Sequence, residues 1–431
     1  MPDIRPFRGV FYADQRDISR KISPPYDVLT ERDIVSYRKM DKHNVVRLIL
    51  NKGDTINGTR LNGYDASSFY FSNWQRQGIL RKDEQPGIYL YEQRFNYNSK
   101  DYRRIGFMSA VKLEEFGSNK VFPHENTFTG PIEDRLKLTI ATRANLCPIF
   151  SLFPDRDKRI MTLLLKSEKK QMAVAKDRNG VIHALYRINN TKSIDSVRKA
   201  LFDKPFFIAD GHHRYTSALK YRERMRSISQ TGNTEKPSDF VMMYLCPMES
   251  LDLLILPIYR LVKFHRKVDV QKILISAEKY FKISKTSSMN RGIEAIEHTP
   301  KSRNVFCLRF KKDKTVYILE LKNRDVMKRL NKDNFGEERL FLDVSVLHML
   351  FIGDILGMNH NVAEKNIRYS HNSRDLMTTM REGWGDCIVL LKSPTVDQIQ
   401  AVTSNGDKMP HKSTFFYPKL YSGMLFRSLV E

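Results

Sequence analysis

Apolar and polar positions alternate between strand-like and helix-like patterns along the 431 residues of the chain. Short apolar runs predict buried strands at residues 45–50 and 241–245, and aromatic spacing predicts a helix from 64 to 78. Two apolar segments, 87–95 and 102–113, flank a polar turn and predict an antiparallel hairpin. This alternation indicates a mixed α/β (α+β) fold and argues against an all-α or all-β one.

The same alternation continues along the rest of the chain. The further expected elements are helices at 158–170, 194–201 and 270–281, and strands at 182–186, 304–310 and 315–321. A chain of this length is longer than one usual domain, so we expect several parts. These parts are an N-terminal α/β lobe at 1–153, a lobe with a distinctive polar turn at 154–265, a small appended α/β lobe at 266–335, and a C-terminal segment at 336–431 that returns to the main site.

Composition adds a strong positive charge to this picture. Lys and Arg number 73 against 49 for Asp and Glu, which gives a net charge of +24. The basic residues are spread along the chain, which is typical of a solvated surface, so nucleic-acid binding is a possible function but not the favoured one. The four cysteines form no CxxC pair, and no apolar stretch approaches the ~20 residues of a membrane span. We therefore expect a cytoplasmic protein without a membrane partner, and its oligomeric state is left open.

The densest chemistry lies in residues 207–216, where an apolar run ends in an acid, a glycine, two histidines and an arginine. This pattern predicts a strand, a tight turn and a helix start. Glycine allows close backbone approach, and the first N–H groups of a helix have no partner within it, so the turn is a candidate anion site. The alternative is structural: Asp210 would cap the helix, and the histidines would bind neighbouring loops.

Two further polar clusters precede this turn. Tyr26 and Asp27 follow two prolines, which predicts a rigid corner that is either structural or part of a pocket. His124 and Glu125 could act as a base with its orienting acid or as ligands of a divalent metal. The other polar residues of these clusters are Thr127, Asp134 and Arg135.

Another cluster lies near the C-terminus, where Lys412, Ser413 and Thr414 precede an aromatic run and Lys419. The Lys-Ser-Thr sequence does not follow a glycine-rich loop, and no helix is expected after it, so we reject a Walker A assignment. These four residues form either an anion-binding patch or a basic strand edge.

The clusters belong to a longer series of motifs that resembles a known family. The series comprises PPYDV at 24–28, PHENT at 123–127, DRLKL at 134–138, ANLCPIF at 144–150, ADGHHRY at 209–215 and MPHKSTFFYPKL at 409–420. It resembles the family of domain of unknown function number 1015, in the same order and over nearly the whole chain. The family name establishes relationship and implies no activity.

A second resemblance concerns the DGHHR turn alone. It is similar to the phosphate-binding turn of the ParB and sulfiredoxin-like fold, and especially to the DGHHR of free-serine kinases. This similarity implies a ParB/sulfiredoxin-like strand-turn-helix core with additional mixed-sheet lobes. It also implies that Gly211, His212, His213 and Arg214 hold a nucleotide phosphate, while Asp210 orients or deprotonates an attacking hydroxyl group.

The favoured hypothesis is therefore an ATP- or ADP-dependent kinase, acting with Mg²⁺ on a small hydroxylated metabolite such as serine. Its catalytic residues would be Asp210, His212, His213 and Arg214. Gly211, Tyr215, Lys412, Ser413, Thr414 and Lys419 would bind the cofactor. One alternative is a nucleic-acid-binding or regulatory protein. Another is a metal-dependent hydrolase that uses His124, Glu125, Asp210, His212 and His213, and no metal-ligand set is assigned.

Overall fold

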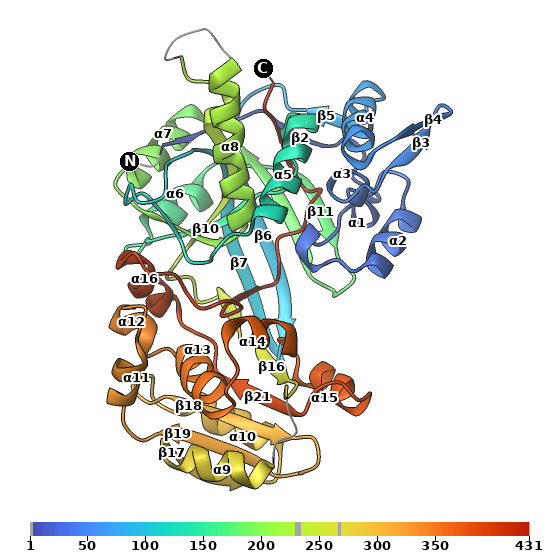
Figure 1. Cartoon of the computed structure of the whole chain (residues 1–431). Coiled ribbons are helices and arrows are strands. Elements are labelled where there is room, and N and C mark those ends of the chain that lie inside the picture. Colours follow the sequence, from blue (N-terminus) through green and yellow to red (C-terminus); the bar gives the residue numbers. More distant parts are fainter. Residues whose placement is uncertain (1–2, 229–233, 266–268, 431) are drawn as a thin grey trace. The chain divides into compact units, whose positions relative to one another are not determined.

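Two compact units make up the chain in the computed structural model (Figure 1). The described residues are 3–228, 234–265 and 269–430. Unit 1 consists of Met1–Leu254 together with Pro418–Glu431, and unit 2 consists of Ile255–Tyr417. Both ends of the chain therefore belong to unit 1. No helix among the described residues is long and apolar enough to cross a membrane.

The boundaries predicted from sequence differ from this division in their number and position. The predicted boundary after residue 153 falls inside unit 1, and those after 265 and 335 fall inside unit 2. The four-part division stays a prediction. The predicted mixed α/β class is confirmed, because both units combine helices with sheets.

A nine-stranded mixed sheet forms the centre of unit 1. Its strands pair in the order β11, β12, β6, β7, β14, β10, β13, β8, and β1 pairs with β7. Their bounds are β1 Ile4–Arg5, β6 Ile88–Tyr97, β7 Lys100–Lys112, β8 Val121–Pro123, β10 Ile149–Phe153, β11 Lys170–Lys176, β12 Ile182–Ile188, β13 Phe206–Asp210 and β14 Phe240–Pro247. The predicted hairpin is formed by β6 and β7. Near one edge, β13 runs antiparallel to β10 and parallel to β8.

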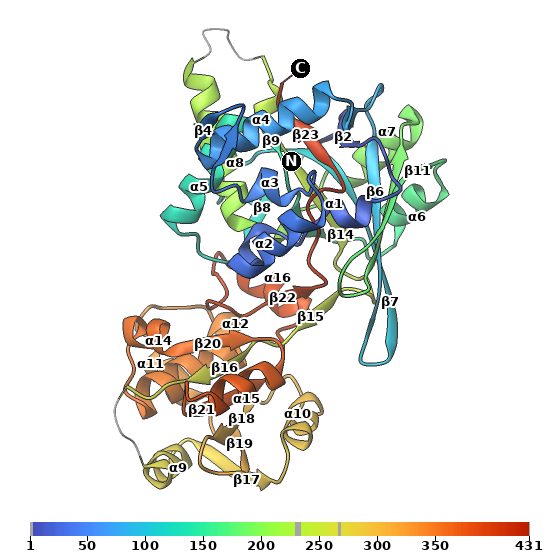
Figure 2. The same cartoon turned by 90° about the vertical axis from the view of Figure 1, so that its right-hand side faces the viewer.

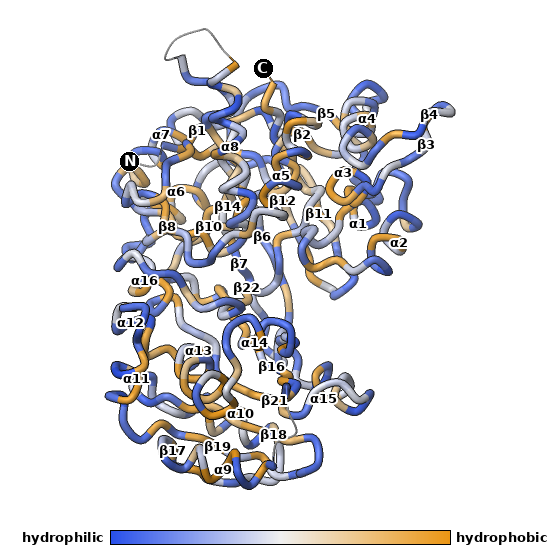
Figure 3. The backbone as a smooth tube through the Cα atoms, viewed as in Figure 1, coloured by the Kyte–Doolittle hydropathy of each residue, from blue (hydrophilic) through white to orange (hydrophobic). Residues whose placement is uncertain are grey.

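Helices α5 (Thr129–Thr142) and α8 (His212–Ile228) lie side by side in unit 1 (Figure 1). The Ser217 hydroxyl of α8 donates to the Ile132 carbonyl of α5 at 2.8 Å. Tyr215 and Leu219 of α8 join a core with apolar side chains of the nine-stranded sheet. Helices α6 (Arg159–Lys166) and α7 (Thr191–Leu201) contribute to the same core. In Figure 3 the hydrophobic positions recur in short stretches that hydrophilic positions separate.

The strand predicted at residues 45–50 is wrong, because the structure has a single helical turn there, α3 (Val46–Ile49). Asn44 explains the difference: its side-chain oxygen accepts the Val46 N–H at 3.0 Å, and its Nδ2 donates to the Arg20 and Ile22 carbonyls. A fully buried apolar run does not by itself distinguish a strand from a helix. Here the contact of Asn44 with the Val46 N–H favours the helical turn.

A second sheet of unit 1 brings the two ends of the chain together. It has four strands in the order β5, β2, β23, β9, so the C-terminal strand pairs with the N-terminal β2. The remaining elements of unit 1 are α1 Ile18–Lys21, α2 Glu31–Met40, α4 Gly63–Arg76, η1 Tyr26–Val28, η2 Pro237–Asp239, β2 Gly9–Tyr12, β3 Asp54–Ile56, β4 Thr59–Leu61, β5 Leu80–Lys82, β9 Ala144–Asn145 and β23 Phe426–Ser428. Helix α4 lies within the predicted range 64–78 apart from its first residue.

Unit 2 is built on a six-stranded antiparallel sheet in the order β17, β19, β18, β21, β16, β20 (Figure 2). The strands are β16 Tyr259–Val262, β17 Phe281–Thr286, β18 Val305–Phe310, β19 Val316–Leu321, β20 Ile367–Ser370 and β21 Cys387–Leu391. Alternate side chains of β18 face different helices. Val305 and Cys307 join the core with α10 and α15. The intervening Phe306 meets Phe351 of the π-helix η3, with ring centroids 5.7 Å apart.

The helices of unit 2 are short. They are α9 Val270–Glu278, α10 Met289–Glu297, α11 Asp325–Leu330, α12 Glu337–Leu340, α13 Asp343–Val346, η3 Leu347–Ile355, α14 His360–Asn366, α15 Ser373–Arg381 and α16 Val396–Ser404. Two further strands complete the chain, β15 (Leu254–Leu256) at the unit boundary and β22 (Phe415–Tyr417). The predicted helix at 270–281 ends earlier than expected, because residues from 281 onward form β17.

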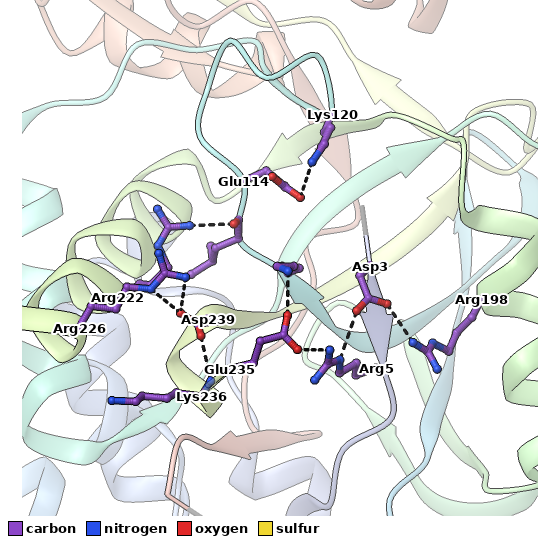
Figure 4. A network of polar contacts seen from close by, with 12 residues as sticks. Asp3, Arg5, Glu114, Lys120, Arg198, Arg222, Arg226, Glu235, Lys236 and Asp239 are labelled. Atoms are coloured by element: carbon purple, nitrogen blue, oxygen red, sulfur yellow. Dashed lines mark hydrogen bonds and ion pairs between the residues drawn. The ribbon is translucent and has the colours of Figure 1, made fainter. Parts of the chain in front are cut away.

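Part of the positive charge of unit 1 is paired with carboxylates in a polar network around β1 (Figure 4). Asp3 lies 3.2 Å from Arg5 and 3.1 Å from Arg198. Glu235 pairs with Arg5 and, at 2.7 Å, with Lys112. Exposed ion pairs of this kind contribute little to stability individually. These cations already have carboxylate partners, so they are not free to bind an external anion.

Gly106 of β7 gives a test of the packing of the large sheet. A Cβ at this position would collide with the Leu245 carbonyl oxygen and lie 2.6 Å from Cζ of Tyr244. We expect Gly106→Ala to lower the free energy of unfolding by about 1–3 kcal/mol, because overpacking forces the strands apart. Gly130→Ala in α5 is the control, since nothing lies within 4 Å of its Cβ position. Urea unfolding of both variants measures the difference, and equal stabilities would contradict the described packing.

Candidate functional site

The turn between β13 and α8 is the predicted strand-turn-helix. Residues Phe206–Ala209 are buried, and the chain turns at Gly211, whose φ is +95°. A Cβ on Gly211 would lie 2.9 Å from Cζ and Nε of Arg214. Glycine is therefore required for two reasons: the positive φ and the guanidinium group that lies against the turn.

Asp210 is held between two cations at this turn. Its Oδ2 lies 3.1 Å from Nη2 of Arg214, and its Oδ1 lies 3.2 Å from Nζ of Lys419. Burial raises the pKa of Asp210, but the charges of Lys419 and Arg214 outweigh burial and hold this pKa below its usual value. Asp210 is therefore ionised at neutral pH. Two cations on one carboxylate leave an excess of one positive charge.

Arg214 is fixed by two contacts and keeps one donor without a partner. Besides Asp210, it donates through Nη1 to the Pro148 carbonyl. Its Nε has no hydrogen-bond partner within the described part of the chain, although the atom is buried. Lys419 is also fixed through its backbone, because its carbonyl accepts a hydrogen bond from Nε2 of Gln93 at 3.0 Å. The two cations thus come from distant segments and are held by different elements.

A small pocket lies beside Arg214. Its polar lining includes Tyr26, Arg135 and Cys147, and its apolar lining includes Leu138 and Ile149. Polar groups that converge in a pocket with apolar walls are typical of a small-molecule site.

Tyr26, on η1, lines this pocket, and Asp27 follows it on the same helical turn. The guanidinium carbon of Arg135 lies 4.1 Å from the centre of the Tyr26 ring. Burial, and then the charge of Asp27, raise the pKa of Tyr26 to about 12. Asp27 remains accessible to solvent. The protein that surrounds it, followed by repulsion from Asp210, raises the pKa of Asp27.

Asp27 and Asp210 are therefore two interacting carboxylates with opposite pKa shifts. Such a pair commonly divides acid–base roles, because one group stays ionised while the other exchanges a proton near neutral pH. Asp210 is the group that stays ionised, since two cations hold it. Asp27 is accessible and has the raised pKa, so it is the better candidate to accept a proton.

His212 and His213 contact the loop at residues 124–128. The N–H of His124 donates to Nε2 of His212 at 3.1 Å, and the N–H of Phe128 donates to Nε2 of His213 at 3.0 Å. Both Nε2 atoms act as acceptors and so carry no proton in this arrangement. The two histidines therefore position the 124–128 loop on the start of α8.

The same loop carries His124, Glu125 and Thr127. Nδ1 of His124 lies 2.6 Å from the Ile208 carbonyl, and burial lowers the pKa of His124. Glu125 lies 3.9 Å from Nε2 of His124 and 3.5 Å from Nδ1 of His212. Thr127 is half-buried in the loop. In the described ranges, no three His, Cys, Asp or Glu side chains form a group that could hold a metal ion.

Arg135, on α5, lines the pocket, and Asp134 precedes it on the same helix. Nε of Arg135 donates to Asp134 at 2.8 Å, and its Nη1 donates to the Ile49 carbonyl at 3.0 Å. The Tyr64 hydroxyl also donates to Asp134, at 2.8 Å. Arg135 is thus presented to the pocket by fixed contacts.

The structure does not bring every predicted residue to this pocket. Tyr215 is fully buried in the core, and its hydroxyl donates to the Glu114 carbonyl at 2.7 Å. Lys412, Ser413 and Thr414 belong to unit 2, whereas Lys419 belongs to unit 1. Ser413 and Thr414 are buried within unit 2, and Lys412 has a left-handed backbone with φ +55°.

Cys147 is a pocket residue that the sequence analysis did not assign. Its Sγ lies 2.8 Å from Oγ of Ser422, and burial raises the pKa of its thiol. The neighbouring Pro148 supplies the carbonyl that Arg214 contacts. Both residues lie in the ANLCPIF motif, which was the available signal, but the motif contains no charged side chain to indicate a site.

The chain belongs to the family described as protein of unknown function DUF1015, whose model matches residues 4–345. This match confirms the family expected from the motifs. Among curated proteins, no sequence matches the chain.

Several solved structures are partly similar. A free serine kinase in complex with AMP has 12% identity, with 69% of this chain and 83% of that chain covered and a TM-score of 0.32. A conserved hypothetical protein from Pyrococcus furiosus has 14% identity, 70% and 90% coverage and a TM-score of 0.32. SbnI with a C-terminal truncation from Staphylococcus aureus has 10% identity, 73% and 85% coverage and a TM-score of 0.33. At these scores the likeness assigns no activity to this chain.

Gly211 allows the geometry of the turn to be tested. We expect Gly211→Ala to destabilise the protein by more than the ~1–3 kcal/mol of backbone strain, because the new Cβ also displaces the Arg214 guanidinium. Gly117→Ala is a matched control, since its φ is +90° but nothing lies within 4 Å of its Cβ position. Thermal unfolding of the two variants distinguishes the cost of backbone strain from the cost of the collision with Arg214. An equal loss in both would show that Arg214 does not lie against the turn.

Proposed function

For this member of the DUF1015 family, we propose a nucleotide-binding phosphotransferase that acts on a small hydroxylated metabolite such as serine. The observation that carries the proposal is Arg214, a pocket-lining cation that is held by Asp210 and Pro148 and has a buried Nε without a partner among the described residues. A guanidinium that is fixed through both Nη atoms and keeps an Nε donor without a partner is suited to phosphate recognition.

The phosphate would bind at the β13–α8 turn. Gly211 has no side chain, so phosphate oxygens can approach the backbone N–H groups at the start of α8. Arg214 and Lys419 would neutralise the phosphate charge, and Asp210 would keep both cations in place. Phosphoryl transfer depends chiefly on positioning and on charge neutralisation, which this arrangement supports.

Asp27 would act as the general base. The substrate hydroxyl oxygen forms a bond to the terminal phosphorus of the nucleotide, the bond from that phosphorus to the nucleotide breaks, and the hydroxyl proton passes to the Asp27 carboxylate. Its accessibility and raised pKa support this role. For Asp210 the sequence left open whether it orients or deprotonates the hydroxyl group; it is less suited as the base, because its ion pairs lower its pKa and so weaken its affinity for a proton.

The two histidines would be positioning residues in this scheme. His212 and His213 hold the 124–128 loop through hydrogen bonds from the backbone. Glu125 and Thr127 would then be placed at the substrate side of the turn. Tyr26 and Arg135 would form the opposite wall.

ATP or ADP would be the phosphate donor, and Mg²⁺ would enter with it. Mg²⁺ commonly binds one or two carboxylates together with substrate phosphates, and it neutralises charge on the transferred group. Lys412, Ser413 and Thr414, in unit 2, remain proposed cofactor-binding residues, but unit 1 carries the groups described above.

Nucleotide binding is tested by thermal unfolding with ADP or ATP and Mg²⁺. At a nucleotide concentration a hundredfold above Kd, we expect stabilisation of about 2–3 kcal/mol, because the ligand binds only the folded protein. Arg214→Met should abolish this stabilisation. Arg16→Met, at an arginine whose side chain is 89% exposed, is the control and should retain it. The proposal fails if neither nucleotide raises the Tm of the unsubstituted protein.

The role of Asp27 is tested by following phosphate transfer to serine and related hydroxylated metabolites. Asp27→Asn should lower kcat by about a hundredfold or more while nucleotide binding persists, because the base is lost and the cations remain. Asp17→Asn, at an exposed aspartate nearby, should leave kcat unchanged. The rate should fall as the pH drops through the pKa of Asp27, above the range of an ordinary aspartate. A full rate in Asp27→Asn would rule out this base.

A further inference from the structure

Arg260 is a buried cation of unit 2 without a counter-ion. It lies on β16 with 1% of its surface exposed. Its Nη1 donates to the Ile258 carbonyl, and its Nη2 donates to the Lys412 carbonyl at 2.8 Å. Within the described ranges no carboxylate pairs with it, and its buried Nε has no hydrogen-bond partner. Burial lowers the pKa of Arg260 to about 10. A buried charge is costly unless it is paired, so this position favours an anion.

The guanidinium group of Arg260 retains an open hydrogen-bonding edge. A guanidinium carries five N–H donors, and the two backbone carbonyls use one on each Nη atom. The Nε hydrogen and one hydrogen on each Nη remain. The Nε donor together with an Nη donor forms the two-donor edge that matches two oxygens of a carboxylate or a phosphate.

A small pocket reaches this arginine, and Ser413 and Lys392 also line it. Among the described residues of the lining, Asp343 is the only acid, and it already has partners: Nζ of Lys392 at 3.6 Å and Nδ2 of Asn304 at 2.8 Å. Burial raises the pKa of Asp343. The Ser413 hydroxyl donates to the Pro410 carbonyl, and Nζ of Lys392 donates to the Pro300 and Arg303 carbonyls at 3.4 and 3.3 Å. Arg260 therefore supplies the pocket with a buried donor, Nε, that has no partner among the described residues.

An imidazole group lies near Arg260. His348, on η3, has a buried Nε2 without a partner in the described part of the chain. Burial, and then the charges of Arg260, His360 and His411, lower the pKa of His348 to about 3. His348 is therefore uncharged at neutral pH, so it neither adds to the charge of Arg260 nor compensates it.

We infer that unit 2 binds an oxyanion, the phosphate or carboxylate group of a small molecule, on the open edge of Arg260 in the pocket lined by Ser413 and Lys392. This site is distinct from Arg214 in unit 1 and does not rest on the proposed phosphotransferase function. Ser413 belongs to the MPHKST segment that the sequence analysis considered as an anion patch. Arg260 is a buried cation that contacts this segment through the Lys412 carbonyl.

The test uses the full-length protein with Arg214→Met, so that anion binding in unit 1 does not contribute. Inorganic phosphate and acetate are each titrated against chloride at equal ionic strength, and the Tm is measured. We expect a saturable rise in Tm with at least one of the two oxyanions. A rise with phosphate identifies a phosphate group as the ligand, and a rise with acetate alone identifies a carboxylate. No rise beyond chloride with either anion would overturn the inference.

Further substitutions identify the residue that is responsible for the rise in Tm. Adding Arg260→Met should remove the rise, whereas adding Arg368→Met, at an exposed arginine of the same unit, should preserve it. Arg260→Lys is the second variant, which is measured if Arg260→Met does not fold. It keeps a cation but loses the two-donor edge, so the apparent Kd should increase by about tenfold or more. A rise in Tm that is unchanged in a folded Arg260 variant would contradict the assignment of the anion site to Arg260.

Discussion

The ion pairs of Asp210 with Arg214 and Lys419 are the interaction on which the candidate site depends. They join the β13–α8 turn to the C-terminal segment of the chain, which returns to unit 1 after unit 2. They also set the charge of the site, because one ionised carboxylate holds two cations. If Asp210 were neutral, both cations would lose the group that orients them. The site therefore requires a folded unit 1 in which both ends of the chain are in place.

The other groups of the site follow from this arrangement. The charge of Asp210 contributes to the raised pKa of Asp27, so the two carboxylates differ in the roles they can take. The histidines that follow Gly211 contact backbone N–H groups of the 124–128 loop, which links the turn to the next wall of the site. A second cation, Arg260, shows the contrasting case in unit 2: it is buried without a carboxylate. Arg214 is held by a carboxylate of the protein, whereas the position of Arg260 favours an external anion.

The parts of the fold and of the candidate site that depend on a local sequence pattern could be predicted from the sequence. The β6–β7 hairpin, α4 and the strand-turn-helix at Gly211 follow from periodicity and from the glycine. Helix α3 was mistaken for a strand because a short, fully buried apolar run is compatible with either element, and Asn44, which precedes the turn, is held by the Arg20 and Ile22 carbonyls. Strand β11 was missed because it is short and largely exposed. The contact of Lys419 with Asp210 spans 209 positions, and the contact of Arg260 with the Lys412 carbonyl spans 152. Neither leaves a local pattern, so charge pairing across the fold was not predictable.

An experimental structure of the full chain with ADP and Mg²⁺ bound tests the central claim most directly. The account predicts a phosphate group at the β13–α8 turn, within hydrogen-bonding distance of Arg214 and near Lys419, while Asp210 still contacts both cations. Asp27 should face the side of the phosphate from which a hydroxyl group would attack. A nucleotide that binds away from the turn, with Nε of Arg214 still without a partner, would contradict the account.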